Sequence, residues 1–439
     1  MNDLRTRAKA FYNAFDFDQP INFGQDDLIG SDQAQPAAMY VERLHGIEES
    51  VDPVVELADQ IDFSQGNGAY LFSGNRGSGK TTELMRLARA MRGAGYELFY
   101  VDISEHLTMT APIELSGLLI AMLGALGEKA RSRFGQDFGK GGFFERAWEM
   151  LRAEVGLDDM PPGTRELRAA LLQSPALLAE LQRRLRPRQH VLVELARQFV
   201  VETINLVRIQ RNEPYRKILL LVDSLEHVRA VGGGDEEVFA AMARLFAQPD
   251  LLRMPGINVV YTVPAYLQLL SPGVGSTFAG GRVFTLPSVH IYERRPNVGE
   301  APEPSERGLA KMLQIVERRH NWHGGFFTAG QVRRLAQNSG GDLRDFFRLL
   351  RLAVAQAARI GAQAPNSVFQ DAEDALRRDM LPLANDERTW LRKIGRSHQS
   401  ELGTRDRVSD FARLLHNKQV LAFRNGEDWY APHPLLRGE

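Results

Sequence analysis

Eight residues have the types and spacing of a phosphate-binding loop: Gly74-Asn75-Arg76-Gly77-Ser78-Gly79-Lys80-Thr81 fits G-x-x-x-x-G-K-[ST]. Residues 70–72 before it are apolar and aromatic, as in a buried strand. After it, apolar residues recur at helical spacing, at Leu84, Leu87, Ala88 and Met91. This order of strand, loop and helix favours a nucleotide-binding loop over a glycine-rich turn that matches by chance. The candidate nucleotide-binding residues are Gly74, Asn75, Arg76, Gly77, Ser78, Gly79, Lys80, Thr81 and Thr82.

The chemistry of this loop follows from its residue types. Its glycines allow backbone N–H groups to surround phosphates, and the start of the following helix adds partial positive charge. Lys80 is expected to reach the β- and γ-phosphates, and the hydroxyl of Thr81 is expected to bind Mg²⁺. The sequence therefore predicts ATP and Mg²⁺ as cofactors.

Two acidic residues follow the apolar run at residues 218–222. Asp223 is expected at the carboxyl end of a buried strand, where a carboxylate is suited to hold Mg²⁺ beside Thr81; the alternative is a residue that caps a turn. Glu226 comes three residues later and is a candidate to orient the attacking water. A glutamate that only interacts with a helix dipole is the alternative for Glu226.

A layered α/β fold is needed to position these residues. Five segments have the composition of strands, and helix-forming segments separate them, which predicts a mostly parallel five-stranded sheet. The predicted strands are residues 70–72, 96–102, 218–223, 257–263 and 282–289. Helices are expected at residues 54–61 and 191–209.

Composition shifts divide the chain into segments. We expect an N-terminal adaptor at residues 1–60, a nucleotide-binding core at 61–295 with a helical insertion at about 113–212, a helical segment at 306–375 and a winged-helix module at 376–439. Breaks in the insertion are expected at 139–142 and 161–163, and a proline-rich linker at 296–305. The last module is predicted from helices followed by a hairpin at 420–430, which contains an Asn425-Gly426 turn.

Composition limits the classes of function. The 439 residues include no cysteine, so disulfides and thiolate metal sites are excluded. The chain begins without the apolar core of a signal peptide and has no long apolar run, so a cytoplasmic protein without membrane contact is expected. Net charge is −1, but residues 301–439 carry 22 Lys and Arg against 17 Asp and Glu. A solvated arginine-rich surface is the first interpretation of this excess, and it also makes this part the better candidate for contact with nucleic acid or an acidic partner.

With these residues in place, the chain resembles AAA+ P-loop ATPases, especially the branch of origin-recognition initiators, transposition regulators and STAND-type signalling NTPases. Four stretches carry the resemblance: GNRGSGKTTEL, ILLLVDSLEHV, INVVYTVP and GGDLRDFFRLL. It implies that Thr262 is the polar sensor 1 residue, that residues 306–375 of the ATPase form a helical lid, and that Arg344 is the sensor 2 arginine of this lid. The alternative for Arg344 is one exposed arginine among many in an arginine-rich helix. The terminal stretch KQVLAFRNGEDWYAPHPLL is similar to the winged helix of the same branch.

The resemblance also implies hydrolysis at subunit interfaces with an arginine from a neighbouring subunit. Arg282 is the candidate, Arg253 and Arg244 are alternatives, and an ordinary surface arginine is the competing interpretation for each. One departure concerns the residue after Asp223: Ser224 stands where most active members place glutamate. ATP binding is therefore expected with slow turnover.

The function that follows is an ATP-switched regulatory ATPase that forms homo-oligomers and drives a separate effector, in a prokaryotic antiphage defence or mobile-element system. A DNA-binding initiator or transposition-type ATPase is the alternative, and a nucleotide-binding subunit without turnover is a third. His320 and His323 are interpreted as surface or lid-packing residues rather than metal ligands. Trp429 and Tyr430 are expected in the core of the terminal module.

Overall fold

The computed structural model describes residues 2–30, 34–45, 52–64, 66–135, 164–230, 234–294, 300–320, 325–360, 364–425 and 427–438. The chain folds into two compact units. The first unit comprises Met1–Pro53, Gly74–Met85 and Thr285–Glu439, and the second comprises Val54–Ser73 and Arg86–Phe284. Each unit combines stretches that are distant along the chain, so this division does not test the four segments expected from the sequence, and their boundaries remain predictions.

A five-stranded sheet forms the centre of the second unit, in the order β4-β5-β6-β3-β7. Its strands are β3 Ala69–Gly74, β4 Tyr96–Asp102, β5 Lys217–Asp223, β6 Asn258–Pro264 and β7 Val283–Leu286. β5 pairs in parallel with β4 and with β6, and the register places Asp102 beside Asp223. The predicted α/β fold with a parallel five-stranded sheet is confirmed.

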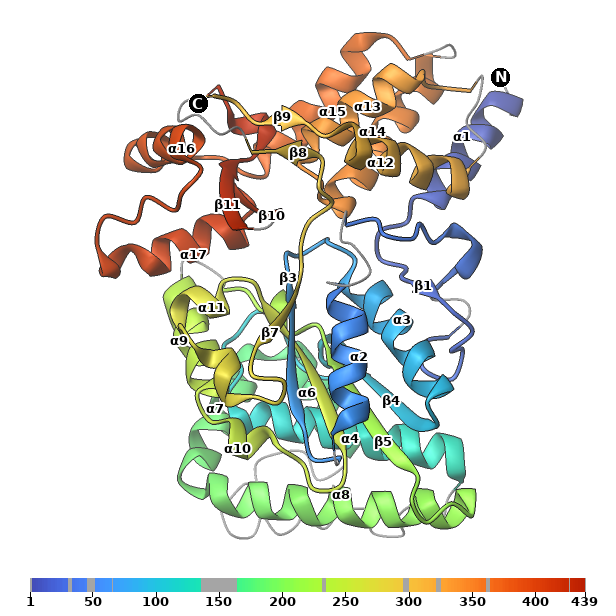
Figure 1. Ribbon diagram of the computed structural model, residues 1–439, viewed down its shortest axis with the longest axis vertical. Coiled ribbons are helices and arrows are strands. Elements are labelled where there is room, and N and C mark those ends of the chain that lie inside the picture. The colour runs from blue at the N-terminus through green and yellow to red at the C-terminus, as the bar shows by residue number, and fades with distance from the viewer. Residues whose placement is uncertain are drawn as a thin grey trace. The chain divides into compact units, whose positions relative to one another are not determined.

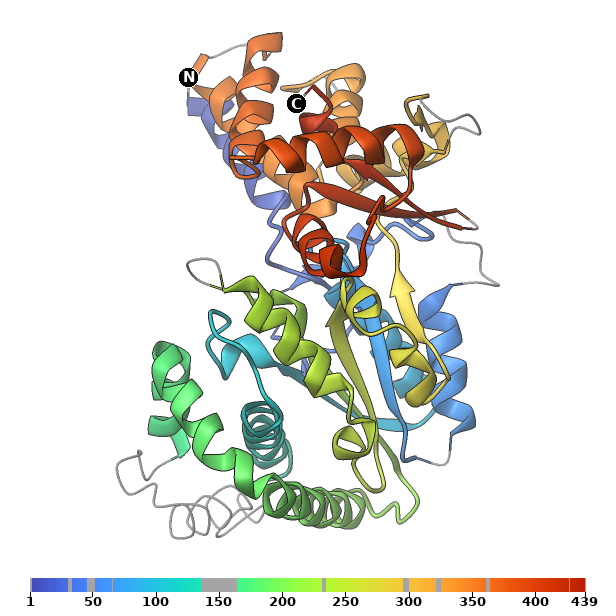
Figure 2. The same cartoon turned by 90° about the vertical axis from the view of Figure 1, so that its left-hand side faces the viewer.

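The strands form because they are almost wholly apolar, and the sheet is covered on both faces. Every residue of β3 and β6 is buried. Figure 2 shows α2 (blue) on one side of the sheet and α4 (teal) and α9 (yellow-green) on the other. These helices are α2 Pro53–Phe63, α4 Leu115–Phe134 and α9 Asp235–Phe246.

The segment between β4 and β5 is helical over its described part, as expected. Its further helices are α6 Thr164–Gln173, α7 Pro175–Leu185 and α8 Gln189–Arg211. Long apolar faces hold them together: α4 buries most of its length and packs against α8, whose buried residues include Val193, Ala196 and Val200. The expected breaks at 139–142 and 161–163 lie outside the described residues. The rest of the second unit is short: η4 Ile103–Glu105, η6 Leu225–His227, α10 Pro249–Leu252, α11 Leu267–Leu270 and η7 Val274–Thr277.

The first unit contains a helical group and the start of the chain. Helices α12 Glu306–Arg319, α13 Ala329–Asn338, α14 Leu343–Ile360 and α15 Asn366–Arg378 follow one another, and α1 Asn2–Ala14 packs along α14 (Figure 1). Ala8, Phe11 and Phe15 line the buried side of this N-terminal segment. A short parallel pair follows, β1 Ile21–Asn22 with β2 Gln35–Pro36, and then η2 Ala37–Met39. Helix α3, Lys80–Gly93, begins in this unit directly after the glycine-rich loop.

The C-terminal part of the first unit has helices and a hairpin, as expected: α16 Asn385–Ser397, η8 Arg405–Arg407, α17 Val408–His416, β10 Val420–Asn425, β11 Glu427–Pro432 and η9 Pro434–Leu436. The hairpin is antiparallel and pairs Phe423 with Trp429. Their rings stack at 4.4 Å between centroids, and Trp429 is 1 % exposed, so its predicted place in the core is confirmed. Tyr430 is half-buried and meets Phe411 edge-on.

Some details differ from the sequence expectations. The last core strand ends at Leu286 rather than at residue 289. The predicted linker contains β9 Glu303–Pro304, which pairs with β8 Tyr292–Glu293; its residues 296–299 lie outside the described part. Among the residues that the structure describes, no helix has both the length and the apolar character needed to span a bilayer.

Candidate functional site

The glycine-rich loop between β3 and α3 is held by contacts within the first unit. Lys80 begins α3 and is 4 % exposed. Its ammonium donates to the carbonyl oxygens of Gly74 and Asn75, at 3.0 and 2.9 Å. The amide of Asn75 donates to the hydroxyl of Ser288 at 3.1 Å. The first N–H groups of a helix have no partner within it, so the loop and the start of α3 present donors that suit an anion.

Two hydroxyls of the predicted nucleotide-binding residues differ in environment. The Oγ of Ser78 is buried and finds no hydrogen-bond partner in the part of the chain that the structure describes, so it is available to a bound group. The Oγ1 of Thr82 instead accepts a hydrogen bond from the backbone N–H of Ile21 at 3.1 Å. Glu83 accepts one from the hydroxyl of Tyr40 at 2.9 Å. Thr82 and Glu83 thus anchor the N-terminal segment to α3.

The turn before α14 lies directly against this loop. The backbone N–H groups of Leu343 and Arg344 donate to the carbonyl oxygen of Gly77 at 3.2 and 3.4 Å. The carboxylate of Asp342 is so close to Gly77 that a Cβ added there would lie 2.5 Å from its Oδ1. Only glycine fits at position 77. The structure therefore brings the backbone of Arg344 against the loop, and its role as sensor 2 remains a prediction.

The guanidinium of Arg344 lies over residues from the start of the chain. Its Nη2 is 3.4 Å from Oδ1 of Asp18, and its centre is 5.2 Å from the ring of Phe17. Arg351, two turns further along α14, contacts Asp16 at 3.6 Å and the ring of Tyr12 at 4.0 Å. Sequence reasoning missed this N-terminal cover, although Ala8, Phe11 and Phe15 recur at helical spacing.

A second group of candidate residues lies within the second unit, at the carboxyl ends of β5 and β6. Asp223 ends β5 and is fully buried. Its Oδ1 accepts the backbone N–H of Ser224 at 2.8 Å, and its Oδ2 accepts the hydroxyl of Tyr100 at 3.0 Å. Burial, followed by the charges of Asp223 and Asp102, raises the pKa of Tyr100 well above its ordinary value. Tyr100 therefore stays protonated and remains a donor to Asp223.

Glu226 and Thr262 meet in the same unit. The hydroxyl of Thr262 donates to Oε2 of Glu226 at 2.9 Å, and both side chains are buried. The ring of His227 lies 3.8 Å from the other carboxylate oxygen. The structure thus brings Asp223, Glu226 and Thr262 to one end of the sheet, the end where ligands bind in open α/β folds.

Sequence reasoning missed Tyr100, but a signal for it exists. Tyr100 and Asp102 alternate along β4 and so face the same side of the sheet, and the parallel register aligns Asp102 with Asp223. Tyr100 lies two residues before Asp102 on the same face of the strand, so its side chain can reach the carboxylate of Asp223 on the neighbouring strand. Asp102 itself serves as a cap, since its Oδ1 accepts the N–H of Ser104 at 2.9 Å.

The three candidate finger arginines have different surroundings within the second unit. Arg282 pairs with Glu56 at 2.8 Å, and Arg253 pairs with Asp250 at 3.0 Å. Arg244 is exposed and forms no ion pair with any residue that the structure describes. The assignment to Arg282 remains a prediction. Elsewhere, His320 packs edge-on against Phe11, and His323 lies outside the described residues.

No protein-family model and no curated protein matches the chain. Three solved structures are similar to it at low identity. The Orc1 protein of Aeropyrum pernix in complex with DNA is 15 % identical to this chain and has a TM-score of 0.35. The match covers 91 % of this chain and 94 % of the Orc1 chain. A Walker-type ATPase of Pyrococcus abyssi is 10 % identical and has a TM-score of 0.39; the match covers 96 % of this chain and 98 % of the ATPase chain. Cdc6p of Pyrobaculum aerophilum is 13 % identical, with 91 % and 94 % covered and a TM-score of 0.38.

Proposed function

We propose that this protein binds ATP with Mg²⁺ and works as a slow ATPase whose bound nucleotide switches its conformation. The contact between Gly77 and the N-terminus of α14 carries this proposal. It supports a lid whose arginine, Arg344, reads the γ-phosphate at the loop that binds it. A guanidinium is suited to this task because it stays charged and offers several N–H donors to phosphate oxygens.

The side chains fit the proposed cofactors. The hydroxyl of Thr81 and the carboxylate of Asp223 are oxygen donors, which Mg²⁺ prefers. The buried hydroxyl of Ser78 without a partner among the described residues supports a polar group bound at the loop. When bound, Mg²⁺ would neutralise charge on the phosphates.

For hydrolysis, we assign Glu226 to orient the attacking water and Thr262 to hold Glu226. The hydrogen bond between them supports these roles. The position after Asp223, where most members of the resembled family carry glutamate, is occupied by Ser224, which has φ +75 and contributes no carboxylate. Turnover is accordingly slow, and the bound nucleotide serves chiefly as a switch.

The regulatory role implies a protein effector and self-assembly. Val201 and Ile209 on α8 and Tyr215 just after it are apolar side chains exposed by 42, 71 and 90 %. Exposed apolar side chains that lie close along the chain support a protein-binding surface on the helical insertion. We propose that the effector belongs to an antiphage defence or mobile-element system.

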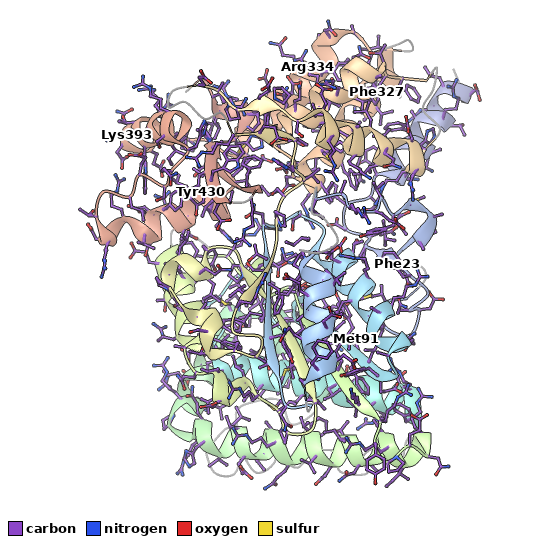
Figure 3. The ribbon with its side chains drawn as sticks, viewed as in Figure 1. Phe23, Met91, Phe327, Arg334, Lys393 and Tyr430 are labelled. Carbon is purple, nitrogen blue, oxygen red and sulfur yellow. The ribbon has the colours of Figure 1, made fainter. Side chains whose placement is uncertain are left out.

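DNA binding is the second candidate, and charge on α16 favours it. Arg392, Lys393 and Arg396 are exposed on this helix, and Figure 3 labels Lys393 there. Basic side chains on one helix supply the phosphate contacts of nucleic-acid binding. Replacing these three residues by alanine should weaken DNA binding and reduce the dependence of the affinity on salt. If the native protein does not bind DNA, this candidate function is excluded.

Titration with a fluorescent ATP analogue in Mg²⁺ tests the main proposal. We expect saturable binding that Lys80→Ala weakens by about 100-fold or more, because a charge-assisted contact to two phosphates is lost. Lys9→Ala, at an exposed position on α1, is the control and should bind as the native protein does. Equal affinity in native protein and Lys80→Ala would refute the proposed nucleotide site.

A further inference from the structure

Lys418 occupies a backbone position that disfavours lysine. Helix α17 ends at His416, Asn417 follows, and Lys418 has φ +59, in the left-handed region. Glycine is the usual residue just past a helix end, because it has no Cβ to clash in the left-handed region. A lysine here points to a compensating interaction of its side chain.

That interaction is a buried ion cluster. The Nζ of Lys418 lies 2.9 Å from Oδ1 of Asp342 and 3.0 Å from Oδ2 of Asp345. The two carboxylate side chains are 2 and 4 % exposed, and that of Lys418 is 16 % exposed. A pair of buried like charges is unfavourable unless a cation lies between them. Lys418 supplies this cation from the turn before the C-terminal hairpin.

The cluster forms the start of α14. The Oδ1 of Asp342 also accepts the backbone N–H of Asp345 at 2.9 Å, so Asp342 caps this helix. Burial raises the pKa of Asp342. Burial acts in the same direction on Asp345, but Lys418, His433 and Arg348 hold its pKa below the ordinary value. The charges of the cap therefore depend on Lys418.

The same cap positions the residues at the phosphate loop. Asp342 contacts Gly77, and the next two N–H groups, of Leu343 and Arg344, donate to the carbonyl oxygen of Gly77. Side chains of the C-terminal part reinforce this link, since Leu421 on β10 and Pro434 in η9 pack on Gly340, two residues before the cap. A continuous series of contacts within the first unit leads from Lys418 to the backbone of Arg344.

We infer that Lys418 is a positioning residue: it fixes the start of α14 against the phosphate loop, sets the place of Arg344, and so couples the C-terminal hairpin to recognition of the γ-phosphate. This inference rests on the proposed function. It implies that a partner that moves the hairpin changes the preference of the protein for ATP over ADP.

The ratio of ATP to ADP affinity tests the inference, because a group that acts through Arg344 affects the binding of ATP, which carries a γ-phosphate, and leaves the binding of ADP nearly unchanged. In Lys418→Met we expect the ratio to fall by about tenfold, with ADP affinity nearly unchanged, because contacts to a charged group are weakened. Lys418→Arg keeps a cation that bridges two carboxylates and should restore the ratio. Adding Lys418→Met to Arg344→Ala should cause no further loss. The matched control is Arg424→Met, which breaks the exposed ion pair with Asp428 on the same hairpin.

Each other outcome overturns the inference. A native ratio in Lys418→Met, or an equal loss of ATP and ADP affinity, shows that Lys418 does not act through Arg344. If Lys418→Met does not fold, the charge-matched variant Lys418→Met with Asp345→Asn is measured instead and is held to the same expectation. A native protein that binds neither nucleotide refutes the proposed function as well, whereas a native preference for ATP that survives in the variant refutes this inference alone.

Discussion

Glu226 is a buried carboxylate that accepts a hydrogen bond from a neighbouring hydroxyl. Its Oε2 accepts from Thr262 at 2.9 Å, and His227 lies 3.8 Å from Oε1. A carboxylate that accepts from a hydroxyl can exchange that donor for water at little structural cost, because the hydroxyl rotates about its C–O bond. This suits a residue that must orient a water molecule during the reaction.

The first prediction concerns this carboxylate. Glu226→Gln keeps the volume and the hydrogen bond but removes the charge, so ATP turnover should fall by about 100-fold or more while ATP affinity stays within about threefold. Phosphate release and equilibrium binding measure the two quantities separately. Glu202→Gln on α8, which replaces an exposed glutamate, is the control. Native turnover in Glu226→Gln would remove Glu226 from the reaction.

The second prediction concerns Tyr100. Tyr100→Phe removes the hydroxyl that donates to Asp223 at 3.0 Å. Loss of a group that orients a metal ligand typically weakens metal binding by about 10- to 100-fold, and a Mg²⁺ titration of ATP turnover should show this shift. Because burial raises the pKa of Tyr100 above 10.0, the native hydroxyl stays protonated at lower pH, and its effect should not vary between pH 6 and pH 9 (roughly the range over which turnover is measured). Tyr215→Phe, at a 90 % exposed position, is the control; an unchanged Mg²⁺ requirement in Tyr100→Phe would contradict the role.

At the scale of single residues, the sequence allowed prediction of those candidates that follow from a pattern of neighbouring residues. The phosphate loop, Asp223 and Glu226 follow from the pattern of a glycine-rich loop and of a strand that ends in acid. Tyr100, Asp342 and Lys418 were missed because their roles depend on partners far along the chain. No local pattern indicates that a lysine after a helix balances two carboxylates at the start of another helix.

The turn between α13 and α14 shows what an element junction requires. Gly340 has φ +66, and a Cβ there would lie 2.1 Å from Cδ1 of Leu421 on β10. Gly403 offers a matched comparison, because it has φ +69 and no atom within 4 Å of an added Cβ. The two positions share the backbone strain of a substitution and differ in packing.

The third prediction uses this pair. Gly403→Ala should lower the free energy of unfolding by about 1–2 kcal/mol, the cost of a left-handed non-glycine residue. Gly340→Ala should lower it by about 1–3 kcal/mol more, because β10 must also shift to admit the methyl group. Chemical denaturation of both variants measures the difference. Equal values would show that Leu421 gives way freely and that the hairpin is not tightly packed on the turn.

Long elements were predictable and short ones were not. The strands β3 to β6 and helices α2, α3 and α8 follow from apolar runs and helical periodicity, which are properties of neighbouring residues. The two-residue pairs β1–β2 and β8–β9 depend on contacts between segments and carry no period. Helix α1 is a long element that the sequence analysis missed, although Ala8 and Phe11 recur at helical spacing on its buried side.

For the molecule as a whole, the first unit gathers three separate stretches of the chain: the N-terminal residues, the phosphate loop and everything from Thr285 onward. Composition and linkers suggest boundaries where the chain is rich in proline or glycine, but they cannot show which distant stretches pack together. The union of the glycine-rich loop and helices α12 to α15 in one compact unit is the feature from which both the proposed switch and the proposed role of Lys418 follow.

Assembly is the remaining property of the whole molecule, and Arg282 provides its test. Within its own chain Arg282 is paired with Glu56 at 2.8 Å and is 51 % exposed, so it is accessible to a neighbouring subunit if it leaves that pair. An arginine supplied in trans accelerates phosphoryl transfer by roughly 10³-fold or more, so Arg282→Ala should lose turnover to that extent while it still binds ATP. The variant Glu226→Gln should also be inactive, but it retains Arg282 and can supply it to a neighbouring subunit. Mixed in equal amounts, the two variants should regain turnover, because each Arg282→Ala site with an intact Glu226 borrows the arginine of its neighbour. Full activity of Arg282→Ala alone would move the assignment to Arg244, and a mixture as inactive as its components would show that hydrolysis needs no neighbour.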